Sequence, residues 1–130
     1  MKLFSPEKAN ALIPVLTPLV EELFSKRREL AIKLLENDPG LLAARGRPSG
    51  TPVGSKPSQR KFAELKAEIV RIVERIEAHG CIMKDLDLGL LDFPAVRAGR
   101  PVYLCWKAGE TRVGFWHAMD EGFGSREPLQ

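Results

Sequence analysis

The side chains best suited to chemistry lie in the C-terminal stretch PVYLCWKAGETRVGFWHAMDEGFGSREPLQ and in the segment just before it. An imidazole can transfer a proton near neutral pH, a carboxylate can orient the imidazole, and a guanidinium can hold an anion through two hydrogen bonds. His117, Glu110 and Asp92 are therefore candidate catalytic residues, and Arg126 and Arg100 are candidate ligand-binding residues. In the competing interpretation, the same side chains only fasten the C-terminal tail to a sheet.

A metal site is the next possibility. The chain has two histidines and two cysteines, numerically a four-ligand zinc set: His79, Cys81, Cys105 and His117. Their spacing does not form a CxxC or zinc-finger pattern, so we expect no metal and no cofactor. A mixed site of His117 with Asp92, Asp120 or Glu121 stays open as a chemical alternative. Nucleophilic catalysis by Cys105 would need a base within reach, and none is obvious, since mid-strand cysteines are commonly small buried hydrophobes.

Two strands form a hairpin in this region, PVYLCWK and TRVGFWH, joined at AGE. We predict a turn at Ala108 and Gly109, with Lys107 facing Glu110. Continued along both strands, this register places Cys105 and His117 on opposite faces. It groups Cys105 with three other side chains on an amphipathic face that suits a subunit interface or a ligand groove: Tyr103, Trp116 and Arg112.

The preceding residues must position this hairpin. Ser5 and Pro6 begin a helix over 5–37 with a leucine stripe at helical spacing, and a kink or break is expected between Asn10 and Pro18 because of Pro14 and Pro18. A basic loop rich in Gly, Pro and Ser follows over 39–57, and a second helix over 58–79 ends at a glycine. A β-rich part spans 81–118, and a glycine-rich tail spans 119–130. This order predicts one α+β domain, with two long antiparallel helices packed on a small antiparallel β-sheet.

Composition limits the function classes. A length of 130 residues allows one domain, and a net charge of +3 is too mild to indicate a nucleic-acid partner. The basic loop also lacks aromatic residues interleaved with its charges, which single-strand binding needs. No signal peptide or membrane-spanning stretch is recognisable, so we expect a cytoplasmic protein without a membrane partner.

Several short motifs are specific in combination: GLLDFP, LCWKAGE, FWH and GFGSR, after a helix containing ANALIP. Together they resemble an uncharacterised bacterial family, domain of unknown function 2203, over nearly the whole chain. The resemblance implies a small bacterial protein and brings no activity. The family pattern does not include His79 or Cys81. It includes these positions: Lys84, Asp85, Asp92, Arg100, Cys105, Trp106, Glu110, Trp116, His117 and Arg126.

The long apolar seams and the aromatic hairpin exceed what a chain of this size can bury alone. We therefore expect an interaction module that assembles as a homo-oligomer, with a dimer as the simplest form. The alternative is a small metal-dependent or acid/base enzyme with its site at the C-terminal hairpin, so whether the chain is an enzyme stays open. We also expect the basic loop to be mobile and to be cut first by trypsin at Arg45, Arg47 or Lys56.

Overall fold

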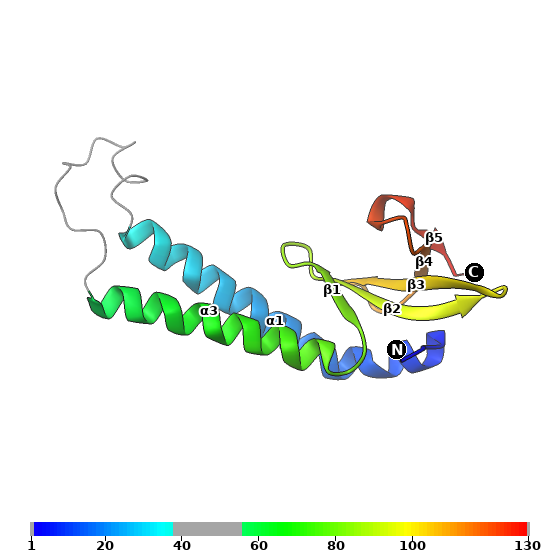
Figure 1. Cartoon of the computed structure of the whole chain (residues 1–130), viewed down its shortest axis with the longest axis horizontal. Coiled ribbons are helices and arrows are strands. Elements are labelled where there is room, and N and C mark those ends of the chain that lie inside the picture. The colour runs from blue at the N-terminus through cyan, green and yellow to red at the C-terminus, as the bar shows by residue number, and fades with distance from the viewer. Residues whose placement is uncertain (1, 38–55, 130) are drawn as a thin grey trace. The chain divides into compact units, whose positions relative to one another are not determined.

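The structure is a computed structural model that describes residues 2–37 and 56–129 (Figure 1). Two helices, α1 (Pro6–Asn37) and α3 (Lys56–Glu77), precede five strands. The strands are β1 (Ile82–Asp85), β2 (Leu90–Arg97), β3 (Arg100–Lys107), β4 (Phe115–Ala118) and β5 (Glu127–Pro128). A short 3-10 helix at Phe123–Ser125 precedes β5. Most of the expected loop over 39–57, with the trypsin sites Arg45 and Arg47, lies outside the described residues. Lys56 is instead the first residue of α3, so the second helix spans 56–77 rather than the expected 58–79.

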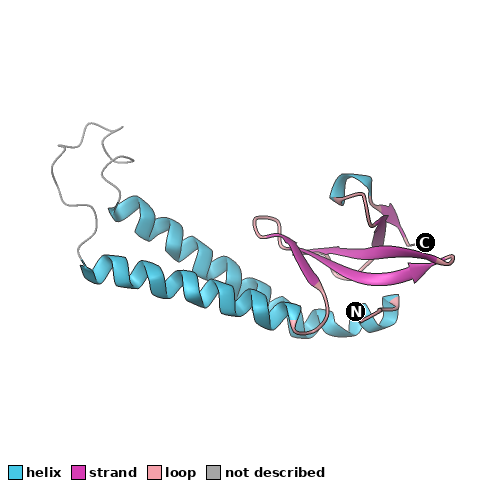
Figure 2. Cartoon of the chain, viewed as in Figure 1, coloured by secondary structure: helices cyan, strands magenta, loops and turns pink. Residues whose placement is uncertain are grey.

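The strands form one antiparallel sheet in the order β1-β2-β3-β4-β5 (Figure 2). Helices followed by an antiparallel sheet make this an α+β fold, as the sequence predicts. The tail contributes more than expected, because its end pairs with β4 as the edge strand β5. By contacts within the chain, the molecule divides into a sheet unit, residues 1–21 with 73–130, and a hairpin unit, residues 22–72.

The sheet unit has an apolar face and a polar face. Along β2 and β3, the paired side chains of one face are apolar and buried: Leu91 with Trp106, Phe93 with Leu104, and Ala95 with Val102. Phe4 joins this core. Its ring and that of Phe93 pack edge to face, with their centroids 5.2 Å apart, and its amide donates to the Pro94 carbonyl at 2.7 Å. The intervening residues of the strands point to the opposite face, where the candidate site lies.

The start of α1 continues through both of its prolines as one helix, so of the kink or break expected between Asn10 and Pro18, the break is wrong. Pro14 and Pro18 are exposed. Their rings therefore lie on the outer side of the helix, and they leave the Asn10 and Pro14 carbonyls without a helical donor. Proline four residues apart thus costs stability here without ending the helix.

The register of the β3–β4 hairpin also differs from the prediction. The turn is confirmed, because the Glu110 amide donates to the Lys107 carbonyl at 3.0 Å. Past the turn, residues 111–114 leave the sheet, and pairing resumes with Cys105 opposite Phe115 and Tyr103 opposite His117. Residues 111–114 lie outside the sheet because Val113 bonds to α1 instead. The Val113 amide donates to the Asn10 Oδ1 at 2.7 Å.

The hairpin unit consists of antiparallel segments of α1 and α3, as predicted. Lys26 on α1 pairs with Glu68 on α3 at 3.2 Å, and Glu29 pairs with Lys61 at 3.9 Å. As the residue number rises along α1, the number of its partner on α3 falls, so the two segments are antiparallel. Neither helix, over its described residues, combines the length and apolar character needed to cross a membrane.

Candidate functional site

A histidine–aspartate pair lies on the polar face of the sheet. Asp92 is in the middle of β2 and His117 is in β4, and both side chains are buried, with 2% and 3% of their surface exposed. His117 Nε2 lies 3.2 Å and 3.1 Å from the two carboxylate oxygens of Asp92. The histidine thus has a carboxylate partner, and that partner is Asp92 rather than Asp120 or Glu121.

A backbone contact fixes the chemistry of the imidazole. His117 Nδ1 lies 2.8 Å from the Ala118 carbonyl oxygen, which can only accept a hydrogen bond. We therefore assign the hydrogen to Nδ1. Nε2 then faces the carboxylate of Asp92.

Cys105 completes this cluster from the central strand β3. It is the direct cross-strand neighbour of Asp92, and its Sγ lies with the Asp92 carboxylate and the His117 imidazole in a group whose atoms are all within 4.8 Å. Burial, reinforced by the nearby charge of Asp92, raises the pKa of the Cys105 thiol to about 11. Burial likewise raises the pKa of Asp92, and the neighbouring His117 only partly opposes that change.

The sequence-based prediction did not place Cys105 beside His117. In the predicted register this thiol and His117 point to opposite faces, whereas the observed register brings them to the same face. The signal that could have revealed this was Asn10, a polar residue on the inner side of a helix that needs a partner.

A second side-chain pair, which is ionic, lies beside the pair of His117 with Asp92. Arg126 binds both carboxylate oxygens of Glu110, at 3.1 Å and 2.5 Å. Its guanidinium also lies against the rings of Phe115 and Phe123, at 4.0 Å and 4.3 Å. Bidentate contact with stacking is the geometry in which arginine is held most firmly.

This pairing shifts the acidity of the carboxyl. Burial alone would raise the pKa of Glu110, but the hydrogen bonds from Arg126 and from the Lys107 amide outweigh it and lower the pKa. The two pairs meet at Cys105, because Arg126 Nη1 lies 3.9 Å from its Sγ. Four predicted site residues therefore share one face: Asp92, Glu110, His117 and Arg126.

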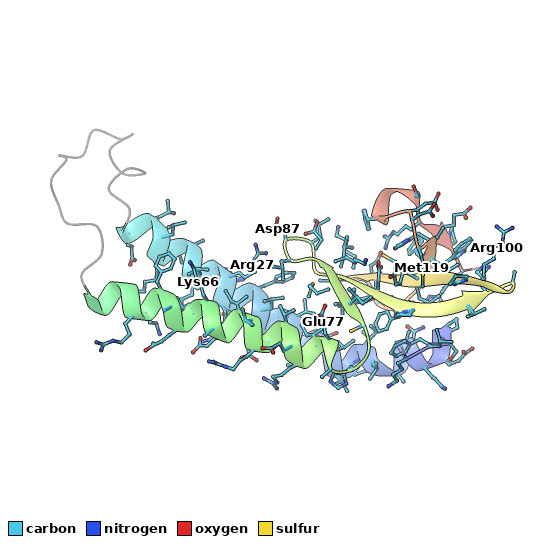
Figure 3. All side chains as sticks on the ribbon, viewed as in Figure 1. Arg27, Lys66, Glu77, Asp87, Arg100 and Met119 are labelled. Atoms are coloured by element: carbon cyan, nitrogen blue, oxygen red, sulfur yellow. The ribbon has the colours of Figure 1, made fainter. Side chains whose placement is uncertain are left out.

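The remaining candidates lie elsewhere. Arg100 is exposed next to the tight β2–β3 turn, away from the cluster (Figure 3). Tyr103 shares the polar face, with its ring 5.6 Å from His117. Trp116 pairs with Leu104 on the opposite face, so the predicted grouping of Tyr103 with Trp116 is wrong. Arg112 is exposed in the segment that leaves the sheet.

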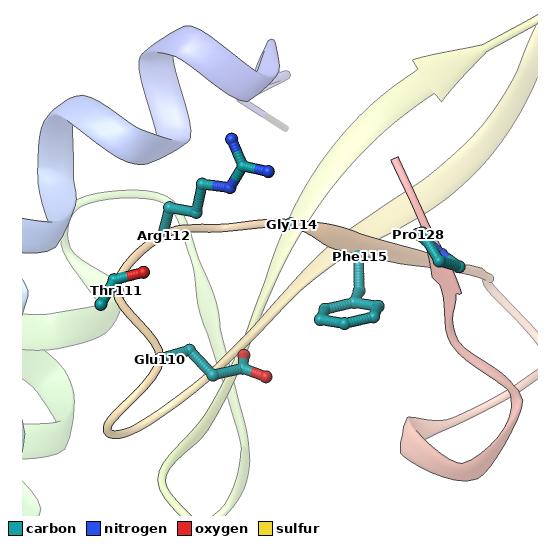
Figure 4. Close-up of a pocket in the computed structure, with 6 residues that line it drawn as sticks. All are labelled: Glu110, Thr111, Arg112, Gly114, Phe115 and Pro128. Carbon is teal, nitrogen blue, oxygen red and sulfur yellow. The ribbon is translucent and has the colours of Figure 1, made fainter. Parts of the chain in front are cut away.

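A pocket of about 400 Å³ opens beside the second pair (Figure 4). Its described lining consists of these residues: Glu110, Thr111, Arg112, Gly114, Phe115 and Pro128. The Arg112 side chain points away from Glu110 (Figure 4). The pocket thus borders one of the predicted catalytic residues, Glu110, while Asp92 and His117 lie buried outside that lining.

Comparison with known proteins agrees with the motifs. The family model described as "uncharacterized conserved protein (DUF2203)" matches residues 2–129. Neither a curated protein nor a solved structure matches the chain. With the motifs and the match extending over almost all of its residues, the chain belongs to the family of domain of unknown function 2203.

Proposed function

We propose that the protein is a cytoplasmic interaction module that assembles as a homodimer through the hairpin unit. The observation that carries the proposal is the small core of that unit. Among its described residues, only three apolar side chains are buried: Leu23, Leu65 and Ile72. Two helices alone have only one seam in which to bury apolar groups, so the rest of their apolar surface needs another partner.

The exposed apolar side chains are large. Ile32 and Leu35 are three residues apart on α1 and are 49% and 53% exposed, and Val70 on α3 is 56% exposed. Residues three apart share a helix face. A second copy of the same hairpin would present the same apolar groups, and the four helices could then enclose one core.

Light scattering during size-exclusion chromatography, over a range of concentrations, tests this proposal. We expect a dimer for the parent protein, and at least tenfold weaker association for Val70→Glu and Leu35→Glu, because each places a charge in the apolar contact. Arg71→Glu is the matched control, since it introduces the same side chain at the neighbouring exposed position of α3. A parent protein that stays monomeric at every concentration would overturn the proposal.

An acid/base enzyme receives less support from the geometry. Both oxygens of Glu110 are engaged by Arg126, and His117 with Asp92 is buried away from the lining of the nearby pocket. A general base needs to reach the proton that it removes. These groups already bond to one another: His117 with Asp92 joins two strands, and Arg126 with Glu110 holds the tail.

A further inference from the structure

The polar face of the sheet brings together three side chains that are each good metal ligands. Asp92, Cys105 and His117 come from the neighbouring strands β2, β3 and β4, and each offers one donor atom within 4.8 Å of the other two. All three are buried, and Cys105 is 1% exposed. A carboxylate, a thiol and an imidazole thus converge in a place that the neighbouring strands hold rigidly.

The imidazole is oriented as in a metal centre. Since Nδ1 is assigned as a donor to the Ala118 carbonyl, at 2.8 Å, the Nε2 side of the ring is directed at the other two donors. Histidines that bind metals commonly use their second ring nitrogen in this way, because the contact fixes both the tautomer and the ring orientation. The hydrogen bond to the Ala118 carbonyl therefore supplies the orienting contact that metal-binding histidines commonly have.

The donor set selects the kind of metal. Calcium and magnesium prefer oxygen ligands only, whereas zinc accepts sulfur, nitrogen and oxygen together. A carboxylate and a thiolate together balance the charge of a divalent ion. Zinc bonds of about 2.0–2.3 Å put tetrahedral ligand atoms roughly 3.2–3.8 Å apart, which the observed cluster can reach with small movements.

The second pair, Arg126 with Glu110, supports the same centre. Arg126 Nη1 lies 3.9 Å from Cys105 Sγ, and its charge is fixed there by Glu110 and by the two phenylalanine rings. A guanidinium at this position would stabilise a thiolate. Arg126 is accordingly a positioning residue and not a ligand.

We propose that Asp92, Cys105 and His117 bind one Zn²⁺, with a water in the fourth coordination position. The thiol of Cys105 gives up its proton to solvent when the metal binds. This site lies wholly in the sheet unit, so it does not rest on the dimer proposed above. Three protein ligands leave one position of a tetrahedral zinc ion open, and the water fills it.

Metal titration of the parent protein tests the site. We expect one equivalent of Zn²⁺ to bind, in competition with a chromophoric chelator, and Co²⁺ in its place to give the thiolate-to-cobalt charge-transfer band. Cys105→Ser, which changes only one atom, should remove that band and weaken zinc binding at least a hundredfold. Asp92→Asn and His117→Gln should weaken binding to a similar extent.

The second cysteine provides the matched control. Cys81 is also buried, but it lies outside the cluster and its thiol donates to the Ile76 carbonyl. Cys81→Ser should keep the cobalt band and the stoichiometry. Circular dichroism shows whether each variant is folded. The proposal would be overturned if the folded parent protein bound no Zn²⁺. It would also be overturned if the Cys105→Ser variant bound Zn²⁺ as tightly as the parent protein does.

Discussion

At the scale of single residues, Arg126 has several partners on the polar face. It binds Glu110 through two hydrogen bonds and lies against two phenylalanine rings. We predict that Arg126→Ala lowers the free energy of unfolding by about 1–3 kcal/mol, because it leaves a partly buried carboxylate without its partner. Urea unfolding followed by tryptophan fluorescence measures this change.

Arg112→Ala is the control for that measurement. Arg112 is exposed in the segment after the turn, and substitutions of exposed side chains change stability by about 0.5 kcal/mol or less. Equal effects of the two substitutions would show that the contacts of Arg126 add nothing to the fold. A loss confined to Arg126→Ala would identify it as the residue that fastens the tail.

The Glu110 carboxyl should make stability depend on pH. Its pKa is lowered in the folded protein from 4.5, against the effect of burial, by Arg126 and the Lys107 amide. A group with a lowered folded pKa adds stability above its unfolded pKa and loses it as the pH falls through the folded pKa. We predict that the parent protein is more stable than Glu110→Gln at pH 7, and that this difference shrinks below about pH 4.5.

The comparison with Glu110→Gln also separates this carboxyl from Asp92. Burial raises the pKa of Asp92, so its contribution has the opposite sign: stability falls as the pH rises above its unfolded pKa. Asp92 is present in both proteins and cancels in the difference between them. Unfolding free energies measured from pH 3 to pH 7 provide the check, and a difference that stays constant with pH contradicts the assignment.

At the scale of elements, Asn10 joins the start of α1 to the segment that follows the β3–β4 turn. Its Oδ1 accepts from the Val113 amide at 2.7 Å, and its Nδ2 donates to the Val113 and Pro6 carbonyls at 3.3 Å and 2.9 Å. We predict that Asn10→Ala lowers the unfolding free energy by about 1–3 kcal/mol, since the Val113 groups lose their partners. Lys8→Ala, at an exposed position on the same helix, is the control, and thermal unfolding measures both.

The contact between Asn10 and Val113 also explains why the register of β4 could not be predicted from the sequence. Local signals predicted the elements well: the cap and proline at the start of α1, the apolar stripes, and the turn at Ala108 and Gly109. The register of β4 depended instead on Asn10, which is distant in sequence from Val113 and bonded to it. A shift of this kind changes which side chains face each other. The prediction therefore selected Asp92, Glu110, His117 and Arg126 correctly as neighbours, but it missed the place of Cys105.

At the scale of the whole molecule, the core is concentrated in the sheet unit. Outside Leu23, Leu65 and Ile72, the described buried apolar residues all lie within 1–21 and 73–130. The pairing of Lys26 with Glu68, at 3.2 Å, shows that the two helices are neighbours at that level. A short turn could therefore replace the distal part of the hairpin, since connections between neighbouring helices commonly take about 2–8 residues.

We predict that a chain in which a four-residue Gly/Asn turn replaces residues 27–67 still folds cooperatively and no longer dimerises. The sheet unit keeps its buried groups, and the exposed apolar residues Ile32 and Leu35 are removed along with their helix segment. Urea unfolding detected by tryptophan fluorescence measures the folding, and light scattering measures the dimerisation. Phe93→Ala in the shortened chain serves as the control: deleting that fully buried ring should cost about 3–5 kcal/mol and abolish or greatly weaken the transition. A shortened chain without any cooperative transition would mean that the sheet unit depends on the hairpin for its folding.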